Sequence, residues 1–415
     1  MPKNGLTIFN QKLKMVRPFS TVGDYVRRTA EGTVKRYLEL FRGVIVTGPR
    51  RAGKTTLAER IGETLGAELV SMDDPLELEY FESRPKAFAE RHPSKYLIID
   101  EVQYAENAGR IMKYLIDVEK RRIIATGSSA ELLSKDVVSH LVGRVGIVEL
   151  FPFSIEEFLR AKGLENAYPE EKRDAVLEHL RYGGYPEVVL AEDDREEILK
   201  NLLITAIQRD AARIANASER EVMRTVLSIA AAGGNTVEYS TLARNAGVKY
   251  TRVRRIVDAL EASYLVYVAR PYHRNRASEL RKAPKVYFTD TGIKHTVEGK
   301  FGEAVSGSDV ETLVLSELLK AGYRPKYWRT KGGAEVDFVV ENGLHLIPVE
   351  VKTAWGGGIP PGLREFLNTY GNSTPVAVIT DLSTEKKAME YRGVRVVKCP
   401  VWELGEFLRR YTGSG

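Results

Sequence analysis

Residues 48–55 are the part of this chain whose residue types and spacing most directly predict chemistry. They read Gly-Pro-Arg-Arg-Ala-Gly-Lys-Thr, between an apolar run at 44–46 and a helix-like stretch that begins at Thr56. A strand, a G-x-x-x-x-G-K-[ST] loop and a helix in this order are typical of a phosphate-binding P-loop. Gly48 and Gly53 leave the backbone unhindered, so that its N–H groups can cradle an anion. We therefore predict that ATP binds here.

Two side chains of this loop are expected to act on the nucleotide directly. Lys54 can neutralise charge on the β- and γ-phosphates, and Thr55 offers a hydroxyl to Mg²⁺. The alternative is a glycine-containing turn that happens to hold a lysine, but such a turn does not require the flanking strand and helix. The predicted nucleotide-binding residues are Gly48, Pro49, Arg50, Arg51, Ala52, Gly53, Lys54, Thr55 and Thr56.

A second strand ends in two carboxylates at Asp100 and Glu101. A P-loop ATPase needs a carboxylate at a strand end for the Mg²⁺ shell, which suits Asp100. A further carboxylate can orient and activate the attacking water, which suits Glu101. Two acids after an apolar strand are common in any protein. Their distance after the P-loop is what makes the catalytic interpretation the stronger one.

Two later positions extend the predicted ATPase site. A strand at 122–125 ends in Thr-Gly-Ser-Ser, where Ser128 is our choice for contact with the γ-phosphate or the water and Thr126 is close behind. Both residue types also favour turns, so a purely structural role stays open. Arg144 precedes another strand, and an arginine there can stabilise charge on a neighbouring subunit's γ-phosphate. A solvated loop is the alternative for Arg144.

Composition limits the class of protein. The chain has 415 residues, enough for two to four domains, with 43% apolar and 28% charged residues. The net charge of +6 and a pI near 9.0 favour a nucleic-acid partner. With no apolar run long enough for a membrane span and no secretory h-region, we expect a cytoplasmic protein. Cys399 is the single cysteine, and scarce glutamine beside abundant charge suggests a thermophilic source.

The middle of the chain reads as a helical connector followed by helix-turn-helix punctuation. Residues 151–213 look helical, with a break at 183–186. Helices are expected at 219–232, 240–246 and 251–260, with Ser240 as a cap and a basic wing beyond them. The predicted DNA contacts are Lys249, Arg252, Arg254, Arg255, Arg274 and Arg276. A protein-binding module is the alternative, and no base-reading signature is evident.

The carboxyl-terminal part carries a second constellation. Glu311 lies on a predicted helix, and Asp337 precedes a hairpin turn at 341–343 whose return strand ends with Glu350 and Lys352. Two carboxylates can bind Mg²⁺ or Mn²⁺, with Glu311 completing the shell and Lys352 positioning the water that attacks a phosphodiester. Strand alternation is expected to place the apolar neighbours Val336, Phe338, Val349 and Val351 on the opposite face. A solvated strand edge or a non-cleaving binding module is the alternative.

Taken in order, these motifs resemble a family of AAA+-like P-loop ATPases of archaea and bacteria. Members of that family carry a winged helix and a carboxyl-terminal PD-(D/E)xK nuclease-like domain. The resemblance covers nearly the whole chain and implies ATP hydrolysis by a homo-oligomer, of which a hexamer is one candidate, with Arg144 as the finger in trans. The matching stretches are 48–56, 98–103, 126–129, 143–144, 151–158, 183–187, 287–292 and 335–338.

We therefore expect an α/β protein in four parts. These are an AAA+-like ATPase domain (1–150), a helical lid or connector (151–215), a winged-helix domain (216–300) and a nuclease-like domain (301–415). The expected function is ATP-dependent action on duplex or branched DNA in repair, recombination or mobile-element processes. The alternative is an ATP-switched signalling ATPase whose nuclease-like domain binds nucleic acid or protein without cleaving.

Overall fold

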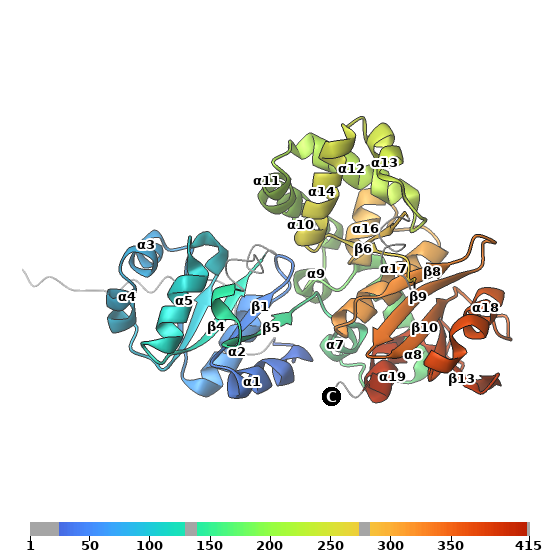
Figure 1. Ribbon diagram of the computed structural model, residues 1–415, viewed down its shortest axis with the longest axis horizontal. Helices are drawn as coiled ribbons and strands as arrows, with labels where there is room; N and C mark the ends of the chain where they lie inside the picture. The colour runs from blue at the N-terminus through green and yellow to red at the C-terminus, as the bar shows by residue number, and fades with distance from the viewer. Residues whose placement is uncertain (1–24, 129–138, 274–282, 413–415) are drawn as a thin grey trace, which may run out of the picture.

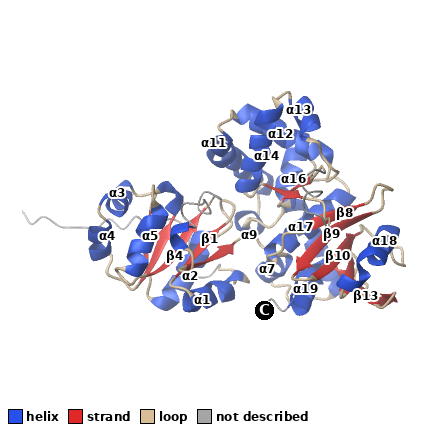
Figure 2. Ribbon diagram, viewed as in Figure 1, coloured by secondary structure: helices blue, strands red, loops and turns tan. Residues whose placement is uncertain are grey.

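The computed structural model describes residues 25–128, 139–273 and 283–412. Three groups of elements stand apart in it: a first α/β unit, a helical group and a second sheet with its helices (Figure 1). Strands gather in the two α/β units, and the group at the top of the view is mainly helical (Figure 2). Arg274 and Arg276, which the sequence predicts to touch DNA, lie outside the described residues.

The first sheet has five parallel strands in the order β2-β3-β4-β1-β5. Apolar residues on both faces bury its central strands, as expected for a parallel sheet covered on both sides. The carboxyl ends of parallel strands meet at one edge, so this edge collects the ends of β1, β3 and β4. The strands are β1 (Gly43–Thr47), β2 (Glu68–Ser71), β3 (Tyr96–Asp100), β4 (Arg122–Gly127) and β5 (Val145–Glu149).

Helices cover both faces of this sheet. Leu38 and Ile61 from α1 and α2 pack in one apolar core, while Phe81, Phe88 and Leu115 from α3, α4 and α5 pack in the other. The predicted α/β ATPase-like fold with a parallel sheet is confirmed. The elements are α1 (Ala30–Leu40), α2 (Lys54–Leu65), α3 (Pro75–Ser83), α4 (Pro85–Arg91), the 3-10 helix η1 (Val102–Tyr104) and α5 (Ala108–Asp117).

The connector is helical, as expected, and breaks at Gly183–Tyr185. A Cβ on Gly184 would lie 2.3 Å from the Phe153 carbonyl oxygen, so only glycine fits there. Its N–H donates to Asp290 Oδ2 at 2.8 Å, which ties the connector to a later part of the chain. The elements are α7 (Ile155–Ala161), α8 (Pro169–Tyr182), α9 (Pro186–Leu190), α10 (Arg195–Thr205), the π-helix η3 (Ala206–Ala211) and α11 (Ala212–Ala215).

Four further helices and a two-stranded antiparallel sheet lie, together with α10 and α11, in the group at the top of Figure 1. The expected helix positions are confirmed, but Ser240 is not a cap, because α13 begins one residue earlier, after Glu238. Ile256 and Leu260 are fully buried, as helical spacing predicts. The elements are α12 (Glu219–Ala232), α13 (Tyr239–Ala246), α14 (Tyr250–Ala262), β6 (Val266–Ala269), β7 (Lys285–Phe288) and α16 (Thr291–Glu298).

The second sheet has six strands in the order β12-β13-β11-β10-β9-β8. Helices α17 and α19 pack on one core of this unit, and α18 packs on another. No helix in the described ranges is both long and apolar enough to cross a membrane. The elements are α17 (Gly307–Lys320), β8 (Lys326–Arg329), β9 (Glu335–Asn342), β10 (His345–Val351), α18 (Pro361–Tyr370), η4 (Gly371–Ser373), β11 (Val376–Asp381), β12 (Lys387–Tyr391), β13 (Val394–Pro400), η5 (Val401–Glu403) and α19 (Leu404–Thr412).

A register shift where β9 pairs with β8 changes which residues share a face. The pairing slips between Lys326 and Trp328, as it does at a β-bulge. Val336 consequently packs in the core under α18, whereas Phe338 packs in the core that contains α17. The expectation that these two residues share a face is therefore wrong, because the irregularity interrupts the strict alternation of the strand. Asp337 lies at this irregularity.

Burial of His179 predicts a specific acid sensitivity. Burial lowers the pKa of His179 to about 3, so the folded state keeps it neutral where an unfolded chain protonates it below about pH 6.5. Its contribution to stability is therefore present above pH 6.5 and is lost as the pH falls.

A His179→Phe variant tests this effect. In that variant the Phe153 carbonyl keeps its hydrogen bond from Lys320 Nζ, which is 2.8 Å long. Urea unfolding should show the stability of wild type relative to the variant falling by about 1.4 kcal/mol per pH unit below pH 6. A constant difference would contradict this.

Candidate functional site

The P-loop runs from the end of β1 to the first turn of α2. Gly48 has φ +146°, and a Cβ there would lie 2.1 Å from the Leu150 carbonyl oxygen. Gly53 has φ +91° and forms the N-cap of α2. Both glycines are therefore needed for the loop to bend and to lie against the chain after β5. The loop brings the amino end of α2 to the carboxyl edge of the sheet, where a phosphate is favoured.

Lys54 is buried at the centre of this loop. Only 5% of the residue is exposed, and its Nζ donates to the carbonyls of Gly48 at 3.1 Å and Pro49 at 2.8 Å. Burial lowers the pKa of Lys54 to about 8, against the raising effect of the nearby Glu101 carboxylate. An anion bound beside the ammonium group would favour its charged form. The loop therefore has the chemistry of a phosphate site.

A magnesium-type donor set lies next to Lys54. Thr55 Oγ1 donates to Asp100 Oδ1 at 2.7 Å, and the Thr126 hydroxyl donates to the same oxygen. The Asp100 side chain is buried at the end of β3. A hydroxyl and a carboxylate so arranged beside a phosphate cradle fit Mg²⁺, which would also take phosphate oxygens and water. Of the two polar candidates at the end of β4, Thr126 and Ser128, Thr126 is the one that contacts the Asp100 carboxylate.

Glu101 is held by two neighbours. Its φ of +55° is unusual for a non-glycine residue, and its N–H donates to Thr126 Oγ1 at 3.2 Å. Gln103 Nε2 donates both to the Glu101 carboxylate and to Ser128 Oγ, the latter at 3.3 Å. Ser128 is thus linked to Glu101 through Gln103. Sequence reasoning gave Gln103 no role, although it lies in the same 98–103 motif.

Arg144 lies at the opposite edge of the first sheet from the P-loop. It directly precedes β5, and Val145 pairs with Gly43 at the beginning of β1. The length of β1, roughly 13 Å, separates this edge from the phosphate cradle. The Arg144 guanidinium pairs with Asp117, with Nε to Oδ1 at 3.0 Å and Nη2 to Oδ2 at 2.8 Å. Its place in the sheet does not bring it to the P-loop of its own chain.

Residues far away in sequence brace the P-loop. Arg28 donates to the Ala52 carbonyl at 2.7 Å and to the Phe151 carbonyl at 2.6 Å, and it pairs with Glu157 at 3.1 Å. Sequence reasoning missed Arg28, because it belongs to no recognisable motif. Asp210, on the π-helix η3, is a second buried group that reaches the loop, where it pairs with Arg50 at 2.9 Å.

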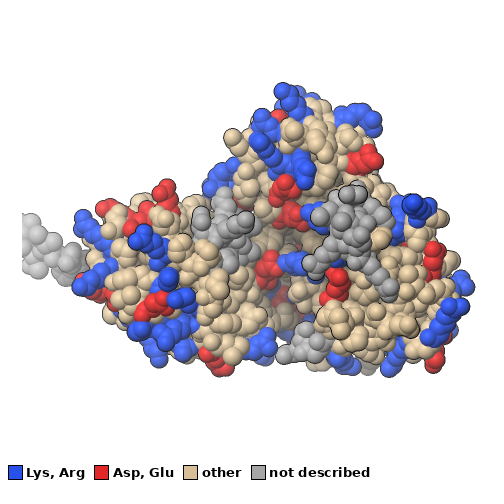
Figure 3. Space-filling view, in the orientation of Figure 1, with Lys and Arg blue, Asp and Glu red and all other residues tan. Residues whose placement is uncertain are grey.

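The predicted DNA-contacting residues on α14 divide into two kinds. Lys249, Arg254 and Arg255 are exposed. Arg252 is half-buried, and its guanidinium donates to the Asn216 carbonyl at 2.7 Å. The space-filling view shows Lys and Arg gathered over the top group (Figure 3). A basic face therefore exists there, and one of its arginines, Arg252, also holds the chain before α12.

The carboxyl-terminal acidic residues are near one another. Tyr287 Oη donates to Glu311 Oε2 at 2.9 Å, and the Val351 N–H donates to Asp337 Oδ2 at 2.8 Å. Burial, followed by the nearby Asp337 carboxylate, raises the pKa of both Glu311 and Glu350 to about 7. Burial likewise raises the pKa of Asp337. These are the shifts expected of carboxylates that are crowded in a dry site.

This acidic cluster meets only part of the requirement for a metal site. Glu350 Oε2 is buried and has no hydrogen-bond partner, while Glu350 Oε1 accepts from Lys352 Nζ at 2.7 Å. A buried carboxylate oxygen without a partner suits a cation. In the described part of the chain, however, no three acidic, His or Cys side chains are placed to hold one metal ion together. The donor chemistry fits a divalent ion, but the side-chain arrangement does not yet form a cage.

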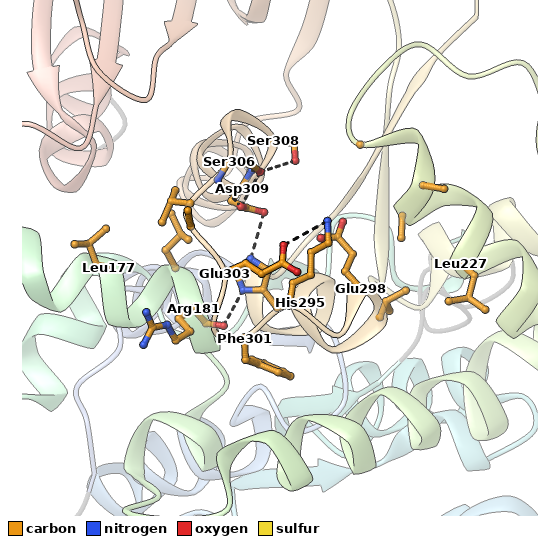
Figure 4. Close-up of a pocket in the computed structure, with 18 residues that line it drawn as sticks. Leu177, Arg181, Leu227, His295, Glu298, Phe301, Glu303, Ser306, Ser308 and Asp309 are labelled. Atoms are coloured by element: carbon orange, nitrogen blue, oxygen red, sulfur yellow. Dashed lines mark hydrogen bonds and ion pairs between the residues drawn. The ribbon is translucent and has the colours of Figure 1, made fainter.

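A cavity of about 680 Å³ lies away from both sites, between α8, α12, α16 and α17 (Figure 4). Several of its polar groups are paired with one another. His295 Nδ1 contacts the Arg181 carbonyl at 2.9 Å, and His295 Nε2 contacts Asp309 Oδ1 at 3.2 Å. Its wall combines apolar residues such as Leu227 and Phe301 with polar ones. We assign the candidate chemistry to the P-loop and the acidic cluster instead.

Family models match three consecutive stretches of the chain. Residues 41–159 match an AAA domain, residues 173–304 match a "Domain of unknown function (DUF8612)", and residues 306–402 match a "Domain of unknown function (DUF4143)". The first match agrees with the P-loop geometry. Residues 41–159 are therefore a P-loop ATPase-like domain.

Sequence similarity to other proteins covers most of the chain. An uncharacterized protein of Haemophilus influenzae is 26% identical over 328 residues, covering 74% of this chain and 81% of its own. One of Mycobacterium tuberculosis is 27% identical over 354 residues, covering 82% and 77%. Among solved structures, a Walker-type ATPase of Pyrococcus abyssi is 15% identical with a TM-score of 0.46, covering 68% of this chain and 99% of that one. The ORC2 protein of Aeropyrum pernix is 14% identical with a TM-score of 0.37, covering 66% and 92%.

Proposed function

We propose that this chain is a Mg²⁺-dependent ATPase. The observation that carries the proposal is the hydrogen bond from Thr55 to Asp100 beside the buried Lys54. In this assignment Lys54 contacts the β- and γ-phosphates, and Thr55 binds Mg²⁺ with Asp100 in its shell. Glu101 activates the attacking water. Mg²⁺, when bound, neutralises the charge that develops on the phosphoryl group.

We further propose that the ATPase works as a homo-oligomer. Arg144 is too far from the P-loop of its own chain to act there, so it would act on the γ-phosphate of a neighbouring copy. Its ion pair with Asp117 is partly exposed, and such pairs exchange partners at small cost.

ATP turnover tests the central assignment. Lys54→Ala removes the ammonium group that neutralises phosphate charge, and Glu101→Gln removes the base, so each should lower kcat by about a hundredfold or more. Glu101→Gln should still bind ATP. The exposed Glu63→Gln, on the outer part of α2, is the matched control and should behave as wild type. Equal turnover by wild type and Lys54→Ala would refute the P-loop assignment.

For the top group we propose a winged helix that binds duplex or branched DNA. Helices α12 to α14 and the hairpin β6–β7 supply the elements of such a domain, and Lys249, Arg254 and Arg255 supply exposed cations at the beginning of α14. A recognition helix with basic residues at its amino end suits contact with phosphates. The net charge of +6 is in keeping with this partner.

DNA affinity should therefore depend steeply on salt. Changing Lys249, Arg254 and Arg255 together to Ala should weaken binding and make the slope of log K against log salt shallower by about 2.7. Lys86→Ala, an exposed lysine on α4, is the control and should leave the slope unchanged. Fluorescence anisotropy with a labelled duplex and a four-way junction measures both quantities. A DNA affinity that does not change with salt concentration would contradict the proposal and favour a protein partner instead.

For the carboxyl-terminal unit we propose a PD-(D/E)xK nuclease-like domain. Glu311, Asp337 and Glu350 would hold Mg²⁺ or Mn²⁺, and Lys352 would position the attacking water. The buried, unpartnered Glu350 oxygen supports this role. Two observations favour the alternative: Lys352 pairs with Glu350, and no three acidic, His or Cys side chains among the described residues are placed to hold one metal ion. In that alternative the chain is an ATP-switched regulatory protein, and this domain binds without cutting.

Cleavage assays separate these two functions. If the domain cuts, wild type should nick labelled DNA with Mn²⁺, and Asp337→Asn should lose at least about a hundredfold of that rate. Glu341→Gln changes an exposed acid on the same strand and should cut normally. No cleavage by wild type on linear, nicked and four-way DNA would remove the nuclease assignment and leave the binding alternative.

A further inference from the structure

Two arginines inside the P-loop are paired with carboxylates of the connector. Arg50 Nε lies 2.9 Å from both carboxylate oxygens of Asp210, on the π-helix η3. Arg51 pairs with Glu187 on α9. The two pairs differ in burial. The Asp210 side chain is 2% exposed and that of Arg50 is 16% exposed, whereas both members of the second pair are largely open to solvent. Because water screens buried charges less, a charge that binds at the P-loop should affect the Arg50–Asp210 pair more than the exposed Arg51–Glu187 pair.

Asp210 has no role in the proposed chemistry, yet its charge acts on the phosphate cradle. Lys54 interacts electrostatically with Asp100, Glu101, Arg50 and Asp210. Asp100 and Glu101 have assigned roles, so Asp210 is the remaining carboxylate of this set. Burial raises its pKa, and Arg50 is the principal group that opposes this rise. Its ionised form therefore depends on Arg50.

The backbone at Asp210 is unusual and is joined to the group at the top of Figure 1. A π-helical turn replaces the regular α-helix between α10 and α11, and such turns recur at functional positions. Ile207 and Ala211 of this turn pack in the same apolar core as Val253 and Ile256 of α14. Because the two helices share this core, a movement of the π-helix would shift α14, which carries the exposed basic residues.

A second contact joins the same two regions. Tyr264, which follows α14, has its hydroxyl 3.3 Å from Thr47 Oγ1 and donates to Glu149 Oε1 at 3.2 Å. Thr47 directly precedes Gly48 of the P-loop. The nucleotide loop and the α12–α14 group are thus in contact both at the base of the loop and at Arg50.

We propose that Arg50 and Asp210 form a latch that senses the terminal phosphate of ATP. Without that phosphate, Arg50 holds Asp210 and the π-helix stays docked on the P-loop. A γ-phosphate beside Lys54 competes for Arg50 and repels the Asp210 carboxylate, so the π-helix is released and α14 is free to shift. ADP lacks this phosphate and leaves the latch closed. This inference rests on the proposed binding of ATP at the P-loop.

Hydrogen exchange on the full chain tests the latch. Peptides that cover residues 195–215 are compared without nucleotide, with Mg²⁺-ADP and with Mg²⁺-ATPγS, after calorimetry has shown whether each nucleotide binds. We expect exchange in the π-helix to be about tenfold faster with ATPγS than with ADP. Asp210→Asn should exchange fast without nucleotide and lose the difference. Arg50→Lys, which keeps the charge but not the fork, should show a reduced difference.

The control is a variant of the exposed ion pair, and the results that overturn the latch differ from the result that overturns the ATPase proposal. Glu187→Gln breaks only the exposed pair with Arg51 and should keep the wild-type response. If both nucleotides bind to wild type and the π-helix exchanges equally with each, the latch is wrong while the nucleotide site stands. If neither nucleotide binds, the proposed ATPase function falls and the latch with it. An unchanged nucleotide response in a folded Asp210→Asn variant would also overturn the latch.

Discussion

The hydrogen bond between Thr55 and Asp100 joins the amino end of α2 to the carboxyl end of β3. It forms because two parallel strands end at the same edge and the P-loop turns back over that edge. Gly48 makes the turn possible, since a Cβ there would collide with the Leu150 carbonyl. Lys54 is buried by the same turn, and a buried ammonium group beside oriented N–H groups is stable mainly when an anion can reach it. The ATPase assignment follows from this constraint.

The remaining parts of the chain are attached to this site through buried polar contacts. Asp290 accepts from Gly184, which fixes the connector against the chain after β7. Arg28, which precedes the P-loop in the sequence, and Asp210, which follows it, both reach the loop, and each is almost fully buried. Buried charged contacts hold their partners in one arrangement, because separating them leaves a desolvated charge without a partner. A bound nucleotide that competes for one of these contacts would therefore change how the connector is attached to the P-loop.

Local signals in the sequence were sufficient to predict the first sheet and the residues at its carboxyl edge. An apolar strand, the glycine spacing and Asp100 after β3 all act within one βαβ unit, so their geometry follows from local rules. Asp210 and Arg28 gave no such signal, because their contacts depend on the tertiary packing of distant segments. The irregularity at Asp337 was also beyond prediction, since strict alternation placed Val336 and Phe338 on one face. The hydrogen bond from Arg252 to the Asn216 carbonyl gave no signal in the sequence either, because Asn216 belongs to the chain before α12.

The central claim is that Thr55 and Asp100 place a divalent ion on a bound nucleotide, and electron paramagnetic resonance of Mn²⁺ tests it most directly. An Asp337→Asn background removes the second candidate metal site, so one site remains. The account predicts one tightly bound Mn²⁺ per chain that requires ATPγS and is lost in Thr55→Ala. Mn²⁺ that binds equally well without nucleotide, or that is unaffected by Thr55→Ala, would contradict it.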